Sequence, residues 1–440
     1  MRAQDKLRLI AEKAGKDKGF KFSSLIHLIN EESLSWCFGE LKKDKAPGID
    51  GVSVEEYGAN LEANLKDLIA RMKANKYRPK PVKRVFIPKP GKDEKRGLGI
   101  PSVEDKLVQI MMKKILEAIY DQDFLDLSYG FRPNKNCHQA VNRLDKVVMT
   151  KPINCIAEVD VEKFFDNVCH YWLLRGLEER IVDPHFLLLV RKFLKAGFID
   201  GGEIQKSVKG TPQGGIISPV LSNIYLHYAL DLWFERKFKP ESKGYVELIR
   251  YADDFLACCE SKHDADEFLV QLEARFSKFK LNLSKEKTSV IKFGRNAWKA
   301  YQKGGERVAT FNFLGFTHYC KTSRKGKFIM GHKTSKQKLS FALSEINLWL
   351  KKVRNMFLLK DWWRVLKAKI IGHYNYFGIS GNMHCLGQFS RSVWWMVFKW
   401  INRRSQKKSM NVAKYQKHLD WNPLPQPRIY HDMYTLSPSR

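Results

Sequence analysis

The sequence predicts an α+β protein in which a strand-rich middle part is followed by an all-α C-terminal part. Between about 155 and 260, apolar strands alternate with helical segments, as in α+β or α/β folds. From about residue 338 onward, apolar side chains recur at helical spacing on single faces, which predicts a helical bundle. The length of 440 residues exceeds one ordinary core and predicts two to four lobes of about 150 residues each.

The N-terminal part is predicted to be largely helical. Apolar residues between about 23 and 75 recur at turn-like spacing, and the turn-forming cluster at 46–51 interrupts them. Between 80 and 101 the pattern changes to short β segments that are separated by prolines and carry a cluster of Lys and Arg. These segments predict a basic hairpin, and a second largely helical stretch follows from 103 to 150.

The charge balance predicts a nucleic-acid partner. The chain has 78 Lys and Arg against 47 Asp and Glu, a net charge of +31, and this excess attracts polyanions through counterion release. An anionic membrane surface is the alternative, but it usually requires a dense basic cluster or a lipid signal, and the sequence has neither. No run approaches about 18 consecutive apolar residues. Because the first residues also lack the apolar segment of a signal peptide, we expect a cytoplasmic protein without a membrane partner.

Positive charge and tryptophan are concentrated in the predicted bundle. Residues 331–420 carry 18 Lys and Arg against 3 Asp and Glu, and residues 331–440 contain 7 of the 11 Trp. Basic side chains interleaved with aromatic rings suit single-stranded or structured RNA. For any one helix, a lysine-rich solvated face on an ordinary bundle is the alternative. The eight cysteines have no Cys-x-x-Cys pair, which indicates reduced core residues and neither a zinc site nor a disulfide framework.

Two acidic motifs mark the strand-rich middle part. In the first, strand alternation places Asp160 near a strand end, on the face opposite the buried one. In the second, two apolar strands meet at a tight turn that contains Asp253 and Asp254. Adjacent carboxylates repel each other there, and Ala252 stands where a type II′ turn favours Gly. Stability alone therefore would not select this turn.

A divalent cation would convert this repulsion into affinity. Mg²⁺ takes carboxylate oxygens together with substrate phosphates. If Asp160 lies beside Asp253 and Asp254 on neighbouring strands, two ions about 3.5 to 4 Å apart could activate a 3′-hydroxyl and stabilise the leaving pyrophosphate. For the dipeptide alone, a solvent-exposed turn without a metal is the alternative.

With its further motifs, the sequence resembles the group II intron reverse transcriptase/maturase family, of the bacterial type that lacks the endonuclease domain. Residues 251–254 look like the family's Tyr-x-Asp-Asp box, and residues 160–165 look like its first catalytic Asp motif. The resemblance extends from about residue 45 to 316. The other matching blocks are Ile87-Pro88-Lys89, Arg96-Gly97-Leu98-Gly99-Ile100-Pro101, Tyr129-Gly130-Phe131-Arg132-Pro133, Gly210-Thr211-Pro212-Gln213-Gly214-Gly215, Leu281-Asn282-Leu283-Ser284 and Phe313-Leu314-Gly315-Phe316.

The resemblance implies a right-hand polymerase fold. The expected parts are an N-terminal helical extension at 1–75, fingers at 76–150, a palm with an antiparallel sheet at 151–330, and a basic helical thumb/maturase domain with its tail at 331–440. Part of the fingers is expected between the catalytic strands of the palm. No endonuclease motif follows Met410, so second-strand cleavage is not expected.

The resemblance also assigns catalytic and metal-binding residues. Asp160, Asp253 and Asp254 are expected to be the catalytic carboxylates, and Val161 joins them as a metal ligand. The expected cofactor is a pair of Mg²⁺ ions, with Mn²⁺ as a substitute.

A nucleotide-binding set follows from the same resemblance. Lys89 and Arg96 are expected to hold the incoming triphosphate, Phe165 to exclude ribonucleotides, Gln213 to line the nucleotide pocket, and Lys287 to act as an acid for pyrophosphate. Each has a plainer interpretation, respectively as a solvated basic hairpin, a core residue, a loop residue and a surface lysine.

Two further positions concern the fingertip and the primer. The family usually has Pro where Gly97 stands, which predicts a looser fingertip. Phe313, Leu314, Gly315 and Phe316 resemble the primer grip, with a buried strand and a glycine bend as the alternative.

The function that the sequence predicts is therefore an RNA-directed DNA polymerase, a reverse transcriptase of a retroelement. We expect it to extend a DNA or RNA primer on an RNA template with dNTPs and to bind group II intron RNA, assisting RNA splicing and mobility. One alternative is a domesticated relative that acts in phage defence or DNA repair. Another is an RNA-binding maturase whose polymerase is dispensable, against which the intact motif at 251–254 argues.

Overall fold

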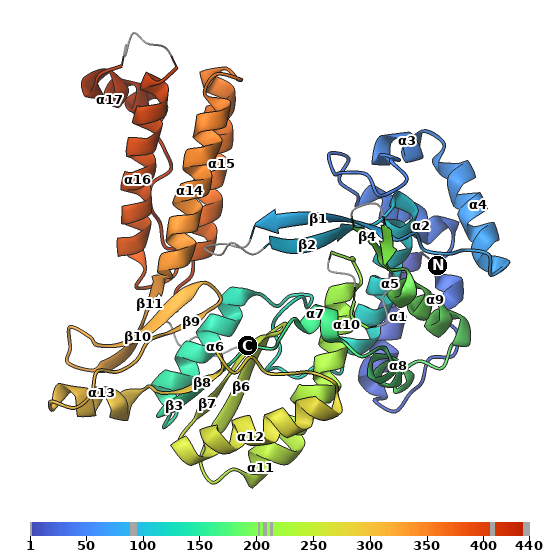
Figure 1. Cartoon of the computed structure of the whole chain (residues 1–440), viewed down its shortest axis with the longest axis horizontal. Helices are drawn as coiled ribbons and strands as arrows, with labels where there is room; N and C mark the ends of the chain where they lie inside the picture. The colour runs from blue at the N-terminus through green and yellow to red at the C-terminus, as the bar shows by residue number, and fades with distance from the viewer. Residues whose placement is uncertain are drawn as a thin grey trace. The chain divides into compact units, whose positions relative to one another are not determined.

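The computed structural model describes residues 2–88, 95–200, 203–205, 209–211, 214–404 and 410–433 (Figure 1). The chain divides into two compact units. The first comprises Met1–Lys89, Glu94–Ala140 and Cys155–Ile291, and the second comprises Pro90–Asp93, Val141–Asn154 and Lys292–Arg440. Helices and strands occur in both units, in agreement with the predicted α+β class.

The first unit combines helices with two four-stranded sheets. Its strands are β1 (Val82–Pro88), β2 (Lys95–Ile100), β3 (Cys155–Val159), β4 (Phe198–Asp200), β5 (Glu203–Gln205), β6 (Val246–Tyr251), β7 (Asp254–Cys259) and β8 (Ser289–Lys292). Its helices are α1 (Ala3–Lys16), η1 (Ile26–Leu28), α2 (Glu31–Gly39), α3 (Val54–Ala59), α4 (Leu61–Lys73), α5 (Val103–Tyr120), α7 (Phe164–Asn167), α8 (His170–Glu178), α9 (Pro184–Lys195), α10 (Ser218–Leu226), the π-helical turns η2 (His227–Asp231) and η3 (Phe234–Phe238), α11 (Lys239–Glu241) and α12 (Lys262–Lys278).

One sheet of the first unit has the strand order β6-β7-β3-β8. Strand β7 pairs antiparallel with both β6 and β3, and α12 lies against β3 and β7 (Figure 1). The alternation predicted for β3 is only partly present. Ile156 and Ala157 are both fully buried, because β3 lies between two neighbouring strands and under a helix.

The basic segments predicted between 80 and 101 form the antiparallel pair β1 and β2, which confirms their strand character. Strand β1 also pairs in parallel with β4, and the sheet order is β2-β1-β4-β5. Helix α5 follows directly. Ser102 caps its N-terminus, and 12 of its 18 residues are buried. A helix that is buried on most of its faces is a central element of the core.

The second unit has a three-stranded sheet and a helical part. Its elements are α13 (Arg295–Gln302), β9 (Phe311–Phe313), β10 (Phe316–Thr322), β11 (Phe328–Thr334), α14 (Lys336–Val353), α15 (Leu359–Phe377), α16 (Met383–Asn402) and α17 (Val412–Trp421). Helix α6 (Cys137–Thr150) begins in the first unit and continues in the second. Helices α14, α15 and α16 lie alongside one another (Figure 1). Their apolar side chains form one core, which confirms the predicted bundle. In the described parts of the chain, every helix is too short or too polar to cross a membrane.

Candidate active site

The motif at 251–254 forms a two-residue turn between β6 and β7. Tyr251 pairs with Asp254, so Ala252 and Asp253 make the turn. Both strands are buried along most of their length, which fixes the turn at one end of the sheet. Ala252 has a φ of 57°, a left-handed conformation that costs a residue with a Cβ about 1 to 2 kcal/mol. The turn therefore adopts a strained conformation without the glycine that would relieve it.

Asp160 lies at the same end of this sheet. The last residue of β3, Val159, is paired with Phe255 of β7, so Asp160 is level with Asp254. The backbone of Asp160 is fixed from its other side. The Ser284 N–H donates to the Asp160 carbonyl at 2.8 Å, and the Asp160 N–H donates to the Thr288 hydroxyl oxygen at 3.4 Å. The strand register thus brings the three acidic residues to one edge of the sheet.

Lys287 contacts this acidic edge directly. Its Nζ lies 3.0 Å from Asp160 Oδ2, and the two side chains are 52% and 46% exposed. An ion pair this exposed contributes only about 0 to 1 kcal/mol to stability. Its consequence is local, because it holds an ammonium group beside the Asp160 carboxylate.

The donor atoms at this edge suit a hard cation. Within the described ranges, no three His, Cys, Asp or Glu side chains already converge to hold a metal ion. Carboxylate oxygens are nevertheless the ligands that Mg²⁺ prefers, and Mg²⁺ usually keeps several positions for water and substrate phosphate. The carboxylate oxygens at this edge therefore suit a hard divalent cation such as Mg²⁺.

The Tyr129-Gly130-Phe131 block, another of the matching motifs, lies against the turn. The Tyr129 N–H donates to the Arg250 carbonyl at 2.8 Å. A Cβ on Gly130 would lie 2.4 Å from the Ala252 nitrogen, a distance that no side chain tolerates. Glycine is therefore required here for the two backbones to approach each other.

Comparison with known proteins decides the family. Residues 87–318, more than half of the chain, match the family model described as reverse transcriptase (RNA-dependent DNA polymerase). Protein YkfC of Escherichia coli K12 is 31% identical over 388 residues, which cover 79% of this chain and 96% of YkfC. The chain belongs to the group II intron reverse transcriptase/maturase family.

Two relatives carry the intron in their names. Group II intron-encoded protein LtrA of Lactococcus lactis subsp. cremoris is 26% identical over an alignment of 457 residues, which covers 85% of this chain and 73% of LtrA. Nuclear intron maturase 4, mitochondrial, of Arabidopsis thaliana is 29% identical over 140 residues, which cover 30% of this chain and 16% of that protein. The sequence-based resemblance is thus confirmed, and the chain is a reverse transcriptase, an RNA-directed DNA polymerase with the right-hand fold of that family.

Phe165 lies between the core and a loop of this reverse transcriptase. Its ring is half-buried and packs on the core of the first unit, and its carbonyl accepts a hydrogen bond from the Thr211 N–H at 2.7 Å. A Cβ on Gly210 would lie 2.9 Å from the same carbonyl. The segment that carries Phe165 is therefore in close contact with the Gly210-Thr211 motif.

The structure describes only the backbone of one of three predicted nucleotide-binding residues and does not describe the other two. Lys89 and Gln213 lie outside the described residues. Arg96 belongs to β2, where its backbone pairs with Ile87, and its side chain lies outside the described part. The Arg84 side chain lies over the neighbouring residue, Gly97. A Cβ at Gly97 would lie 2.3 Å from Arg84 Nε, so only glycine leaves space for Arg84 there.

The predicted primer grip is a tight β-hairpin in the second unit. Phe313 pairs with Phe316, and the turn residues Leu314 and Gly315 have φ values of 50° and 81°. Positive φ at both central positions is typical of a type I′ turn. The Tyr376 hydroxyl donates to the Leu314 carbonyl at 2.9 Å, which ties the turn to α15.

The helices of the second unit expose both aromatic and basic groups. Trp395 is 59% exposed and Trp421 is 80% exposed. Around the buried ring of Trp400, the cationic groups of Arg354 and Lys399 lie 4.5 Å and 5.0 Å from the ring centroid. Exposed rings such as those of Trp395 and Trp421 can stack on bases, and exposed cations such as Lys399 can contact phosphates.

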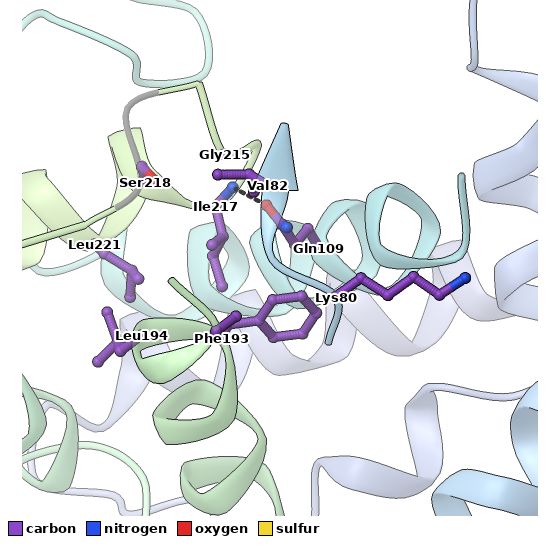
Figure 2. A pocket seen from close by; sticks show the side chains of 10 residues that line it. Lys80, Val82, Gln109, Phe193, Leu194, Gly215, Ile217, Ser218 and Leu221 are labelled. Atoms are coloured by element: carbon purple, nitrogen blue, oxygen red, sulfur yellow. Dashed lines mark hydrogen bonds between the residues drawn. The ribbon is translucent and has the colours of Figure 1, made fainter. Parts of the chain in front are cut away.

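A cavity beside α10 is too small to be a substrate pocket. Figure 2 shows it between Gln109, Phe193 and Ile217. Its volume of about 10 Å³ is room for at most one water molecule. Gln109 Oε1 accepts a hydrogen bond from the Ile217 N–H at 3.4 Å, so this region serves to seat the start of α10.

The sequence did not predict the buried side chains that support the turn at Ala252 and Asp253. Arg250 and Asp231 are both fully buried, and Asn223 lies beside them. A signal was present, because an arginine within an apolar strand and an aspartate within an apolar helix each require a buried partner.

Proposed function

We propose that this reverse transcriptase extends a primer by two-metal nucleotidyl transfer at the acidic edge of the β6-β7-β3-β8 sheet. Asp160, Asp253 and Asp254, with the Val161 carbonyl, would hold the ions. The observation that supports this most is the register that sets Asp160 level with Asp254, beside the turn that carries Asp253. When bound, two Mg²⁺ or Mn²⁺ ions would favour the ionised primer 3′-hydroxyl and neutralise the developing charge of pyrophosphate.

The other residues of the site would bind and orient the nucleotide. Lys287, held at 3.0 Å from Asp160, would protonate departing pyrophosphate as a general acid. Lys89 and Arg96 would hold the triphosphate through charge-assisted hydrogen bonds. Gln213 would line the pocket, and Phe165 would exclude the ribose 2′-hydroxyl.

The template, primer and intron RNA would be bound by surfaces beyond this edge. The hairpin turn at Leu314 and Gly315 would support the primer end. The basic α14, α15 and α16, with exposed Trp395, would bind the template–primer duplex and group II intron RNA, which assists splicing. The name of LtrA, a group II intron-encoded protein, and the charge of residues 331–420 support this part of the proposal.

Loss of one carboxylate should separate chemistry from binding. We expect Asp253→Ala to reduce primer extension on an RNA template by at least about 100-fold, because a metal ligand worth several kcal/mol is lost. Filter binding of the same template–primer should be unchanged, since the basic surface that dominates affinity remains. Asp266→Ala serves as the control, because Asp266 is an exposed acid on α12.

Two outcomes would contradict the proposal. If Asp253→Ala extends primers at the wild-type rate, the metal assignment is wrong. If extension and binding fall together, the turn contributes to holding the nucleic acid rather than to the chemistry.

A further inference from the structure

Arg250 is a buried charged residue that contacts the turn at Ala252 and Asp253. It is the penultimate residue of β6, and its side chain is 0% exposed. Its Nε donates to Asp231 Oδ1 at 2.8 Å and its Nη2 donates to Asp231 Oδ2 at 2.5 Å. Asp231 is also 0% exposed. A bidentate pair fixes the plane of a guanidinium group, which a single lysine contact cannot do.

This ion pair is not explained by stability. Removing two charges from water is costly, and well-packed apolar residues of similar volume often serve a fold equally well. Burial indeed raises the pKa of the Asp231 carboxyl, and the Arg250 guanidinium opposes that shift. In some proteins a buried pair instead fixes a particular conformation, and the contacts of the remaining guanidinium nitrogen identify the backbone segment that this pair could fix.

The third nitrogen of Arg250 reaches the turn itself. Its Nη1 donates to the Ala252 carbonyl at 3.1 Å and to Asn223 Oδ1 at 2.9 Å. Asn223 Nδ2 in turn donates to the Gly130 carbonyl at 2.7 Å. One guanidinium group thus connects the strained turn residue with the Gly130 segment that packs on it.

The bond to Ala252 acts where the backbone is strained. Ala252 has a φ of 57°, and such a conformation persists only where its surroundings determine it. The Ala252 carbonyl belongs to the peptide group that joins Ala252 to Asp253, so its direction sets the position of the Asp253 backbone. Asp231 ends the π-helical turn η2, a kind of turn that occurs frequently at functional sites.

We propose that Arg250 is a positioning residue for the catalytic carboxylates. Locked by Asp231 and Asn223, its guanidinium holds the Ala252 carbonyl and so keeps Asp253 and Asp254 at the sheet end in the geometry that binds metal. This inference rests on the proposed function of the acidic edge as a metal site, and it adds the device that fixes that edge.

The test compares two variants of the full-length protein. Arg250→Met with Asp231→Leu removes both charges and replaces them with apolar groups. Arg250→Lys keeps a cation beside Asp231 but cannot reach Asp231, Asn223 and Ala252 together. The control is Arg275→Lys, because Arg275 donates to the carbonyls of Tyr228 and Ala229 in the same region without contacting the turn.

Three measurements are made on each variant. Hydrogen exchange by mass spectrometry, without metal or nucleic acid, reports on the amides of residues 250–256. Primer extension is titrated with Mg²⁺, and template–primer affinity is measured by filter binding. In both Arg250 variants we expect at least about ten-fold faster exchange in this segment and a several-fold higher Mg²⁺ requirement, with unchanged affinity. The melting temperature should be unchanged in the variant that replaces both charges. The control should behave as the wild type.

The outcomes separate this inference from the proposed function. If either Arg250 variant folds and keeps both wild-type exchange at residues 250–256 and the wild-type Mg²⁺ requirement, the positioning role is wrong. If Asp253→Ala keeps its activity while the Arg250 variants still speed up exchange, the metal assignment fails and the tie to the turn stands. A uniform rise in exchange over the first unit would instead make the pair an ordinary stabilising contact and overturn the inference.

Discussion

Phe165 is a single side chain whose size should decide which sugar enters the site. It is half-buried beside the Gly210-Thr211 loop, and Phe165→Val would open space there. We expect incorporation of ribonucleotides relative to deoxyribonucleotides to rise by about 10- to 200-fold, which corresponds to about 1 to 3 kcal/mol of lost discrimination. Competing dNTP and rNTP incorporation on one RNA template measures the ratio.

The neighbouring phenylalanine provides the control for this prediction. Phe164 is 2% exposed and belongs to the core, so Phe164→Val should lower stability through a cavity without changing sugar selection. An unchanged ratio in a folded, active Phe165→Val protein would show that Phe165 is also only a core residue.

Gly130 is the residue where a single added carbon should disturb the turn. Its Cβ would lie 2.4 Å from the Ala252 nitrogen, and overpacking of this kind costs about 1 to 3 kcal/mol. We expect Gly130→Ala to lower primer extension strongly while template–primer binding is kept, as measured in parallel assays. Gly39→Ala is the matched control, because nothing lies within 4 Å of its Cβ position; equal activity of the two variants would refute the prediction.

His227 should make stability depend on pH. It is 3% exposed, and burial, reinforced by Arg250, lowers the pKa of its imidazole to about 3. Between pH 3 and about 6.5 the unfolded chain therefore binds a proton that the folded protein does not, so the free energy of unfolding falls as pH decreases. At pH 5.5 this residue alone removes about 1.4 kcal/mol relative to pH 8.

Urea unfolding at pH 8 and pH 5.5 checks this expectation. In His227→Gln the loss of unfolding free energy between these pH values should be smaller by that amount. An identical loss in the wild type and the variant would show that His227 titrates normally in the folded protein.

At the scale of the element, the β1–β2 pair shows what occupies the space beside Gly97. The Arg84 guanidinium lies 4.4 Å from the ring centroid of Phe198 and occupies the space above Gly97. We expect Gly97→Pro to displace Arg84 and raise the KM for dNTPs several-fold with little change in kcat. Steady-state kinetics on one template–primer measure both constants, and Arg84→Gln should produce the same change; a change in kcat alone would contradict this.

The sequence was sufficient to predict the strands that carry the acidic motifs and the positions of those motifs in them. Apolar runs around Asp160 and Asp253 predicted strands that the structure contains, and the motif order predicted a family that the comparisons confirm. The sequence was not sufficient for the register or for the partners of Arg250. Asp231 and Asn223 are 19 and 27 positions away from it, and a pairing between such distant positions depends on the tertiary fold rather than on local periodicity.

At the scale of the whole molecule, the carboxylates proposed for catalysis and the largest excess of basic residues lie in different parts of the chain. The acidic edge lies in the first unit, whereas 18 Lys and Arg against 3 acids occupy residues 331–420. Each phosphate contact contributes a salt-dependent part of the affinity. The salt dependence of RNA binding should therefore be controlled by the helices of the second unit and should not follow the net charge of +31 alone.

Replacing four exposed cations on these helices tests this separation. Lys351, Lys352, Lys360 and Arg364 are exposed on or beside α14 and α15. With all four changed to Gln, we expect the slope of log affinity against log salt for template–primer or intron RNA to become shallower by up to about 2.8 to 3.6, since each phosphate contact contributes about 0.7 to 0.9. The control changes Lys239, Lys243, Lys262 and Lys278, around α11 and α12, to Gln, with the same loss of net charge. Because counterion release is local to the contacts, the control should keep the wild-type slope; equal slopes in the two variants would show that RNA responds only to overall charge.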